Sequence, residues 1–109
     1  MAYDGALAGR IRTVLGRKRG ITEKKMFGGL SFLTRGNMFC GITGEDLMVR
    51  VGPEAHPDAL AEPHARPMDF TGRPMKGYVF VAPAGFASAP KLRTWVERGL
   101  AYGRTLPPK

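Results

Sequence analysis

Two histidines and one cysteine, His56, His64 and Cys40, are the residues of this 109-residue chain that could hold a metal ion or act as nucleophiles. Pro57 and Pro63 lie between the histidines, and no second cysteine completes a set of ligands. A zinc site needs three or four ligands within tetrahedral reach, which this spacing does not supply. Cys40 falls on an apolar predicted strand, so we interpret it as a small buried hydrophobic residue rather than a reactive thiolate. We therefore expect neither a metal ion nor another cofactor.

The other polar residues form no recognisable catalytic motif. No serine stands in a Gly-x-Ser-x-Gly segment, and neither Gly28-Gly29 nor Gly72-Arg73-Pro74 continues into the Gly-Lys-Ser/Thr of a phosphate-binding loop. The carboxylates are scattered, so their spacing identifies no acid–base pair. Asp69 is predicted to accept backbone hydrogen bonds in a turn. An enzyme would need a pocket that contains Asp69, His56 or His64, and we expect that the protein is not an enzyme.

Positive charge is concentrated near the N-terminus. The chain has 17 lysines and arginines against 9 aspartates and glutamates, which gives a net charge of +8. A basic domain attracts polyanions through counterion release, so one interpretation is a nucleic-acid surface on the first helix and the residues after it. The other is a solvated helix face that keeps the protein soluble. The candidate nucleic-acid residues are Arg10, Arg17, Lys18, Arg19, Lys24 and Lys25. Arg10 and Arg17 would share one face of a continuous helix.

Length and composition indicate a single folded domain over residues 1–109. No apolar run approaches the roughly 20 residues of a membrane-spanning helix, and the N-terminus lacks the pattern of a secretory signal. A single cysteine is typical of a reducing compartment. We therefore expect a cytoplasmic protein that does not bind a membrane.

The spacing of apolar residues predicts an N-terminal helix followed by short strands. Asp4 is a candidate N-cap, an apolar stripe follows at helical spacing, and Gly20 is expected to end the helix. Gly28-Gly29 suggests a bulge or a close approach of two backbones, and Arg35-Gly36-Asn37 suggests a hairpin turn. The predicted strands cover 23–27, 30–34, 38–43 and 47–51.

The next segment is predicted to contain a short helix and one further strand. Pro57 to Ala61 favours the helix, because proline is tolerated in a first turn. The prolines of 63–74 favour an irregular segment. Residues 76–82 are apolar on both faces, so this strand should lie inside the sheet or beneath a helix.

A second long helix is predicted near the C-terminus. Ser88 is expected to cap it, and Gly99 and Gly103 on its buried stripe would let it lie close to the sheet. Strands and helices are segregated along the chain, which predicts an α+β fold. We expect a single antiparallel sheet of about five strands flanked by N-terminal, short middle and C-terminal helices.

Several short segments are distinctive as a set. They are Lys25-Met26-Phe27-Gly28-Gly29, Gly36-Asn37-Met38, Leu47-Met48-Val49-Arg50-Val51-Gly52, Ala65-Arg66-Pro67-Met68, and Trp95-Val96 together with Leu106-Pro107. Over nearly the whole chain, from about Tyr3 to Pro107, these segments resemble the N-terminal domain of the TfoX/Sxy family.

The resemblance implies a compact α+β sandwich, similar to secretion chaperones, in a bacterial protein. Full-length members of the family include regulators of natural competence, which act with a cyclic-AMP-receptor-type activator on competence promoters. Those proteins carry a second, C-terminal domain similar to a helix-hairpin-helix module. This sequence ends at Lys109, so we expect a stand-alone N-terminal domain. The family offers no catalytic residue to carry over.

From the resemblance and the missing catalytic motifs we expect a non-enzymatic regulatory or adaptor domain that binds another protein. The candidate partner is part of the transcription machinery, and direct nucleic-acid binding is the alternative. Ordered loops on a rigid scaffold often carry recognition. The candidate partner-binding residues are therefore Arg66, Met68, Asp69, Phe70, Arg73 and Lys76. An exposed edge strand could pair two chains, so both a monomer and a homodimer are compatible with the sequence.

Overall fold

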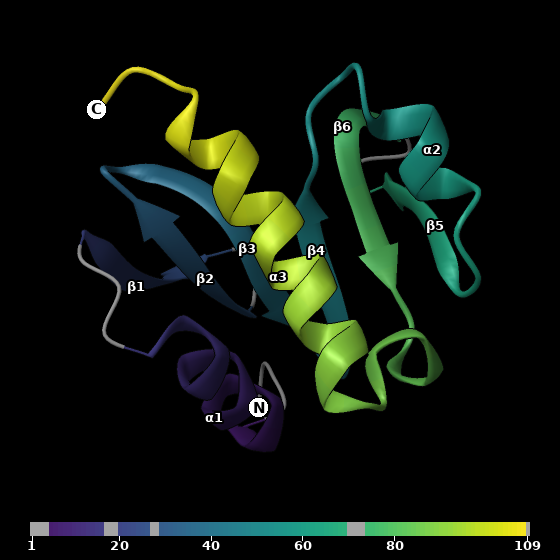
Figure 1. The fold of residues 1–109 in the computed structure, drawn as a ribbon, viewed down its shortest axis with the longest axis horizontal. Helices are drawn as coiled ribbons and strands as arrows, with labels where there is room; N and C mark the ends of the chain where they lie inside the picture. The colour runs from purple at the N-terminus through teal and green to yellow at the C-terminus, as the bar shows by residue number, and fades with distance from the viewer. Residues whose placement is uncertain (1–4, 17–19, 27–28, 70–73, 109) are drawn as a thin grey trace.

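A computed structural model describes residues 5–16, 20–26, 29–69 and 74–108 of the chain. It shows an α+β fold with one sheet, as the sequence predicts (Figure 1). In chain order the elements are α1 (Gly5–Leu15), β1 (Ile21–Met26), β2 (Gly29–Thr34), β3 (Asn37–Thr43), β4 (Asp46–Arg50), α2 (His56–Leu60), β5 (Ala65–Asp69), β6 (Pro74–Val81), the 3₁₀ turn η1 (Pro83–Phe86) and α3 (Ala89–Arg104).

The sheet has six strands in the order β1-β2-β3-β4-β6-β5, and every neighbouring pair is antiparallel. The first four strands form the predicted meander. β6 pairs with β4 and β5, which confirms that it lies inside the sheet. The sheet has one strand beyond the expected number of about five, because β5 occupies the segment that its prolines marked as irregular. Proline is tolerated on an edge strand, and Pro67 lies on one.

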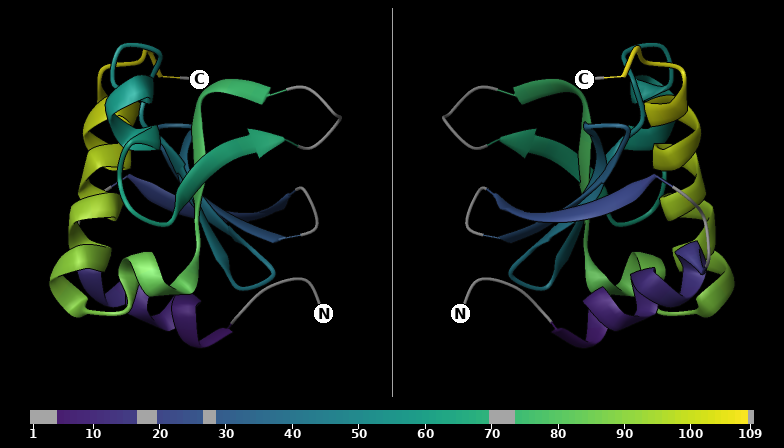
Figure 2. Two further views of the ribbon diagram at one scale, coloured as in Figure 1. Left: turned by 90° about the vertical axis from the view of Figure 1, so that its right-hand side faces the viewer. Right: turned by 90° about the vertical axis from the view of Figure 1, so that its left-hand side faces the viewer.

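The three helices pack on one face of the sheet, so the molecule has two layers (Figure 2). Leu7 of α1, Ala59 of α2 and Leu92 of α3 all belong to the main hydrophobic core, together with the strand residues that face them. Cys40 lies in this core with no exposed surface, as predicted, and burial raises the pKa of its thiol. A smaller cluster of Met38, Met48 and Phe80 lies on the opposite face of the sheet, because alternate residues of a strand point to opposite faces. No helix in the described ranges is long and apolar enough to cross a membrane.

Helix α1 ends earlier than the sequence suggested. It stops at Leu15, and Gly16 follows with a φ of +55°, the left-handed conformation that commonly closes a helix. Gly16 N donates to Arg12 O at 2.9 Å. Gly20, the expected terminator, instead precedes β1 with a φ of +77°. The proposed N-cap, Asp4, lies outside the described residues.

Helix α3 matches its prediction closely. The Ser88 hydroxyl accepts a hydrogen bond from Lys91 N at 3.4 Å and so caps the first turn. Gly99 and Gly103 face the sheet, and a Cβ atom at Gly99 would overlap the carbonyl of Phe39. The two glycines therefore allow the close packing of α3 on β3.

The hairpin formed by β2 and β3 anchors the C-terminal end of the chain. Arg35 and Gly36 form its two-residue turn with φ values of +51° and +84°, as a type I′ turn requires. The buried Asn37 donates from Nδ2 to Pro107 O at 2.9 Å, and Arg35 donates to Arg104 O at 2.5 Å. Two of the distinctive segments, 36–38 and 106–107, thus share one structural role.

A β-bulge explains a third distinctive segment, 47–52. Val51 N and Gly52 N both donate to Gly77 O, at 2.8 and 3.1 Å, so two residues oppose one. Gly52 has a φ of +90° and lies against the ring of Tyr102 on α3. The guanidinium of Arg50 lies over that ring as well, with its carbon 5.5 Å from the ring centre. The bulge therefore lets the sheet meet the end of α3.

Candidate functional site

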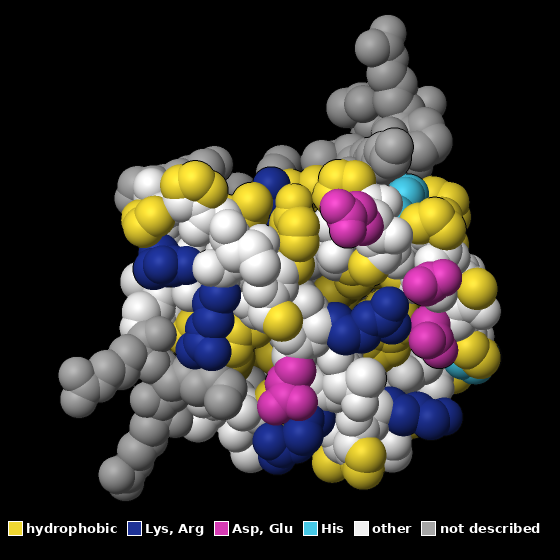
Figure 3. All heavy atoms as spheres, turned by 45° about the horizontal axis from the view of Figure 1, so that its top comes forward, with side chains coloured by type: hydrophobic (Ala, Val, Ile, Leu, Met, Phe, Trp, Pro, Cys, Tyr) yellow, Lys and Arg dark blue, Asp and Glu magenta, His cyan; other side chains and the backbone are white. Residues whose placement is uncertain are grey.

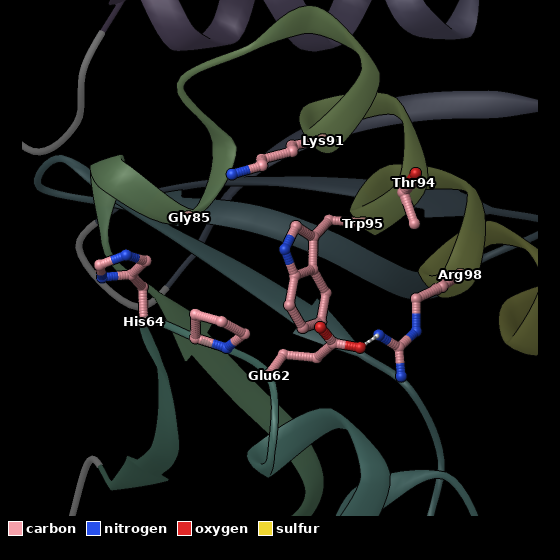
Figure 4. Close-up of a pocket in the computed structure, with 8 residues that line it drawn as sticks. Glu62, His64, Gly85, Lys91, Thr94, Trp95 and Arg98 are labelled. Atoms are coloured by element: carbon pink, nitrogen blue, oxygen red, sulfur yellow. Dashed lines mark ion pairs between the residues drawn. The ribbon is translucent and has the colours of Figure 1, made fainter.

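A recess of about 300 Å³ lies between α3, η1 and the segment 62–64 before β5 (Figure 4). We call it the Trp95 recess. Its lining is mostly apolar, and its rim carries charged and polar groups. The residues that line it are Glu62, Pro63, His64, Gly85, Lys91, Thr94, Trp95 and Arg98.

Backbone geometry sets the wall opposite α3. Gly85 in η1 lies so close to the 62–64 segment that a Cβ atom there would be 3.1 Å from His64 Cβ and 2.6 Å from Val81 Cγ1. His64 has a φ of +68°, which is uncommon for a residue other than glycine. Its carbonyl accepts a hydrogen bond from Ala82 N at 3.0 Å, which ties the segment to the end of β6. The wall is thus held by the sheet rather than by a free loop.

Trp95 forms the floor of the recess. Its side chain belongs to the hydrophobic core and the residue is 6% exposed. In Figure 4 its nitrogen-bearing edge faces the space between Lys91 and His64. No printed hydrogen bond joins this indole N–H to another described residue, and its nitrogen does not belong to the buried polar atoms that lack a partner, so the N–H is accessible to water in the recess. The floor therefore presents to the recess a donor that a ligand can use.

The charges around Trp95 are unequally distributed. At one end, Arg98 lies over the indole ring with its guanidinium carbon 4.7 Å from the ring centre, and it forms an ion pair with Glu62 at 3.5 Å. At the other end, the Lys91 ammonium has no ion-pair partner among the described side chains. The recess is lined by two positively charged residues, Lys91 and Arg98, and by one negatively charged residue, Glu62, so its net charge is +1. The recess therefore suits an apolar group that carries a single negative charge.

The structure describes three of the six candidate nucleic-acid residues, Arg10, Lys24 and Lys25. Arg17, Lys18 and Arg19 lie outside the described residues, and α1 ends at Leu15.

Arg10 donates to Phe86 O at 2.8 Å and to Ala87 O at 3.1 Å, so it joins α1 to η1. Lys24 and Lys25 are exposed consecutive residues of β1, which point to opposite faces of the sheet. On the face drawn in Figure 3, basic, acidic and apolar side chains alternate.

Four of the six candidate partner-binding residues lie on described strands, Arg66, Met68 and Asp69 on β5 and Lys76 on β6. Arg66, on the edge strand β5, pairs with Asp46 Oδ2 at 2.6 Å and lies over the Phe80 ring, with its guanidinium carbon 5.0 Å from the ring centre. Phe70 and Arg73 lie outside the described residues, as do the side chains of Met68, Asp69 and Lys76.

Neither histidine belongs to a metal centre within the described part of the chain, where no three His, Cys, Asp or Glu side chains come together. His64 lines the Trp95 recess. His56 begins α2, and its Nε2 is buried without a hydrogen-bond partner.

In the sequence, Trp95 stood out only as part of the distinctive segment Trp95-Val96, and neither Lys91 nor Arg98 stood out. One signal was available, because Lys91, Trp95 and Arg98 recur at helical spacing and so share a face of α3. His64 and Gly85 approach that face only through tertiary structure, and no sequence pattern as clear as the helical spacing indicates it.

The model of the TfoX N-terminal domain family matches residues 14–102 of the chain. The match contains all six strands, most of α3 and every residue that lines the Trp95 recess. No curated protein matches the sequence.

Proposed function

Because the chain belongs to the TfoX N-terminal domain family, we propose that it is a non-enzymatic regulatory or adaptor domain that binds another protein at the Trp95 recess. The finer assignment is to the regulation of transcription in the bacterial cytoplasm, with a component of the transcription machinery as the partner.

The observation that carries this proposal is the unused indole N–H of Trp95 at the floor of a preformed recess. Tryptophan and arginine dominate the binding energy of protein interfaces when they lie in pockets shielded from water. Trp95 and Arg98 lie against each other at the recess, Trp95 is held by the core, and a bound partner would exclude water from both side chains.

The size of the recess supports a protein partner. About 300 Å³ is at the lower end of the range for small-molecule sites, and it accommodates one large side chain or one chain end rather than a cofactor. Neighbouring surfaces of α2 and η1 would extend the contact around this anchor.

Site-directed photo-crosslinking tests the proposal in cells. A photoreactive residue replaces Thr94, which lines the recess and is exposed, and in a control it replaces Arg93, which is exposed on the same helix but does not line the recess. We expect position 94 to give a discrete protein adduct that disappears when Lys91→Glu is added, and position 93 not to give it. No adduct at position 94, or the same adduct at both positions, would overturn the proposal.

The net charge of +8 supports nucleic-acid binding as a second candidate function. Its test is the salt dependence of binding to duplex DNA, where the affinity should fall steeply between roughly 50 and 200 mM salt. Lys24→Glu with Lys25→Glu should weaken such binding. If affinity is absent, or unchanged by the charge reversal, the alternative is wrong.

A further inference from the structure

We propose that the Trp95 recess recognises the C-terminal carboxylate of its partner, with Trp95 Nε1–H and Lys91 Nζ as the donors to its two oxygens. This inference rests on the proposed function and adds the chemistry of the group that is bound.

The indole N–H of Trp95 is a hydrogen-bond donor that a ligand can use. Trp95 is more than nine-tenths buried, and its N–H faces the recess without an acceptor among the described residues. A ligand that covers this edge of the indole displaces the water there, and it must supply an acceptor because a donor buried without a partner costs free energy. A ligand therefore gains most by placing an acceptor atom at this edge of the indole.

The acceptor should carry a negative charge. The Lys91 ammonium lies on the same side of the recess as the indole N–H, and it has no ion-pair partner within the described part of the chain. Hydrogen bonds to a charged acceptor are roughly twice as strong as neutral ones. An anionic oxygen is therefore the preferred occupant.

The donors of the recess favour a carboxylate over a phosphate. One indole N–H and one ammonium can serve the two oxygens of a carboxylate, whereas a phosphate dianion is usually bound by an arginine fork or several backbone N–H groups. The Arg98 guanidinium is already paired with Glu62, and the Glu62 carboxylate would repel a second negative charge. The single excess positive charge of the recess matches a monoanion.

The bound carboxylate should belong to the C-terminus of a polypeptide. A C-terminal residue carries its side chain one carbon from its carboxylate, so an anion and an apolar group arrive together. The recess has the same arrangement, since the indole N–H and Lys91 lie beside the apolar ring of Trp95, and Pro63 also lines the recess. An aspartate or glutamate side chain within a partner has no apolar group beyond its carboxylate. The expected partner therefore ends in an apolar residue.

The single tryptophan of the chain makes the test direct, because a ¹⁵N–¹H spectrum contains one indole N–H signal. The full chain is titrated with N-acetyl-Ala-Leu that has a free carboxylate and, in parallel, with the same dipeptide as its C-terminal amide. We expect the free acid to move the indole signal saturably and the amide to leave it unmoved. Equal shifts with both peptides would overturn the inference, as would no shift with either.

Two matched variants locate the charge. Lys91→Gln should weaken binding of the free acid about three- to fivefold, the value of an exposed charge pair. Arg93→Gln, which removes an exposed charge elsewhere on α3, should leave the affinity unchanged. Equal loss in both variants would contradict a direct contact with Lys91.

A third titration, with 4-methylpentanoate, separates a chain end from a free carboxylic acid. The dipeptide should bind more tightly, because it also contacts the rim. If the small acid binds equally well, the assignment to a chain end is wrong. The outcomes also separate this inference from the proposed function. If position 94 gives the adduct but the indole signal does not depend on the free carboxylate, the adaptor role stands and only the recognition of a carboxylate is wrong.

Discussion

The guanidinium of Arg98 lies over the indole ring of Trp95, with its carbon 4.7 Å from the ring centre, and covers the end of the ring away from its N–H. Arg98 also pairs with Glu62 across the recess, so one side chain joins α3 to the segment before β5. This contact closes one end of the recess and leaves the donor end open.

Replacing Arg98 by alanine should therefore expose the tryptophan. We expect Trp95 fluorescence to shift to longer wavelength, and the free energy of unfolding to fall by about 1 kcal/mol through the lost cation–π and ion-pair contacts. Urea denaturation and the emission spectrum measure both effects. Arg93→Ala is the control and should change neither; equal effects in the two variants would contradict the stacked contact.

Glycine at position 99 should be required by packing rather than by conformation. A Cβ atom there would overlap the Phe39 carbonyl, so Gly99→Ala should lower the free energy of unfolding by about 1–3 kcal/mol despite the better helix propensity of alanine. Gly9→Ala in α1 is the matched control, because nothing lies within 4 Å of its Cβ position. That change should stabilise the protein by about 0.5–1 kcal/mol. A neutral or stabilising Gly99→Ala would show that α3 does not pack this closely on β3.

The hydrogen bond from Asn37 to Pro107 should stabilise the contact between the β2–β3 hairpin and the C-terminal segment. Asn37→Ala removes the 2.9 Å hydrogen bond that the buried Asn37 side chain donates to Pro107 O, so we expect a loss of about 1 kcal/mol. Thermal unfolding measures it. Removing residues 107–109 from the wild-type chain should cost a similar amount, and adding that truncation to Asn37→Ala should cost little more. Full additivity would contradict a direct interaction.

Glu23 gives the stability a dependence on pH. Its hydrogen bonds with Arg12, at 2.7 and 2.8 Å, hold the pKa of the carboxyl below its usual value of about 4.5. Because the folded-state pKa is lowered, the stabilisation is present above pH 4.5 or so and is lost as the pH falls through the folded-state pKa.

Both side chains are substantially exposed, so the difference between wild type and Glu23→Gln should be under about 1 kcal/mol at neutral pH and should vanish in acid. Urea midpoints between neutral and acidic pH measure it. A difference that grows toward acid would have the wrong sign.

Local sequence signals predicted much of this fold because the interactions behind them are local. The Ser88 cap, the Arg35-Gly36 turn and the buried stripe of α3 each depend on residues close in sequence. The errors have equally specific causes. Gly16 and Gly20 are both able to end α1, and the backbone adopts the left-handed conformation at both. β5 was missed because Pro67 argues against a strand unless the strand lies at an edge, which is a property of the whole sheet.

The Trp95 recess was beyond local reasoning for a related reason. Its floor comes from α3, whose helical spacing was visible. Its wall needs Gly85 and His64, which approach each other only because β6 and β5 pair. An apolar stripe predicts that a tryptophan is buried, but it does not predict whether the indole N–H finds an acceptor.

The most direct test of the account is the affinity of the chain for the partner that position 94 captures, measured by calorimetry for three chains. The account predicts that Lys91→Glu weakens binding at least tenfold relative to wild type, because it places a negative charge beside the bound carboxylate. Arg93→Glu, which reverses a charge on the same helix outside the recess, should bind within about twofold of wild type. Equal affinity of all three chains would contradict the claim that the Trp95 recess is the binding site.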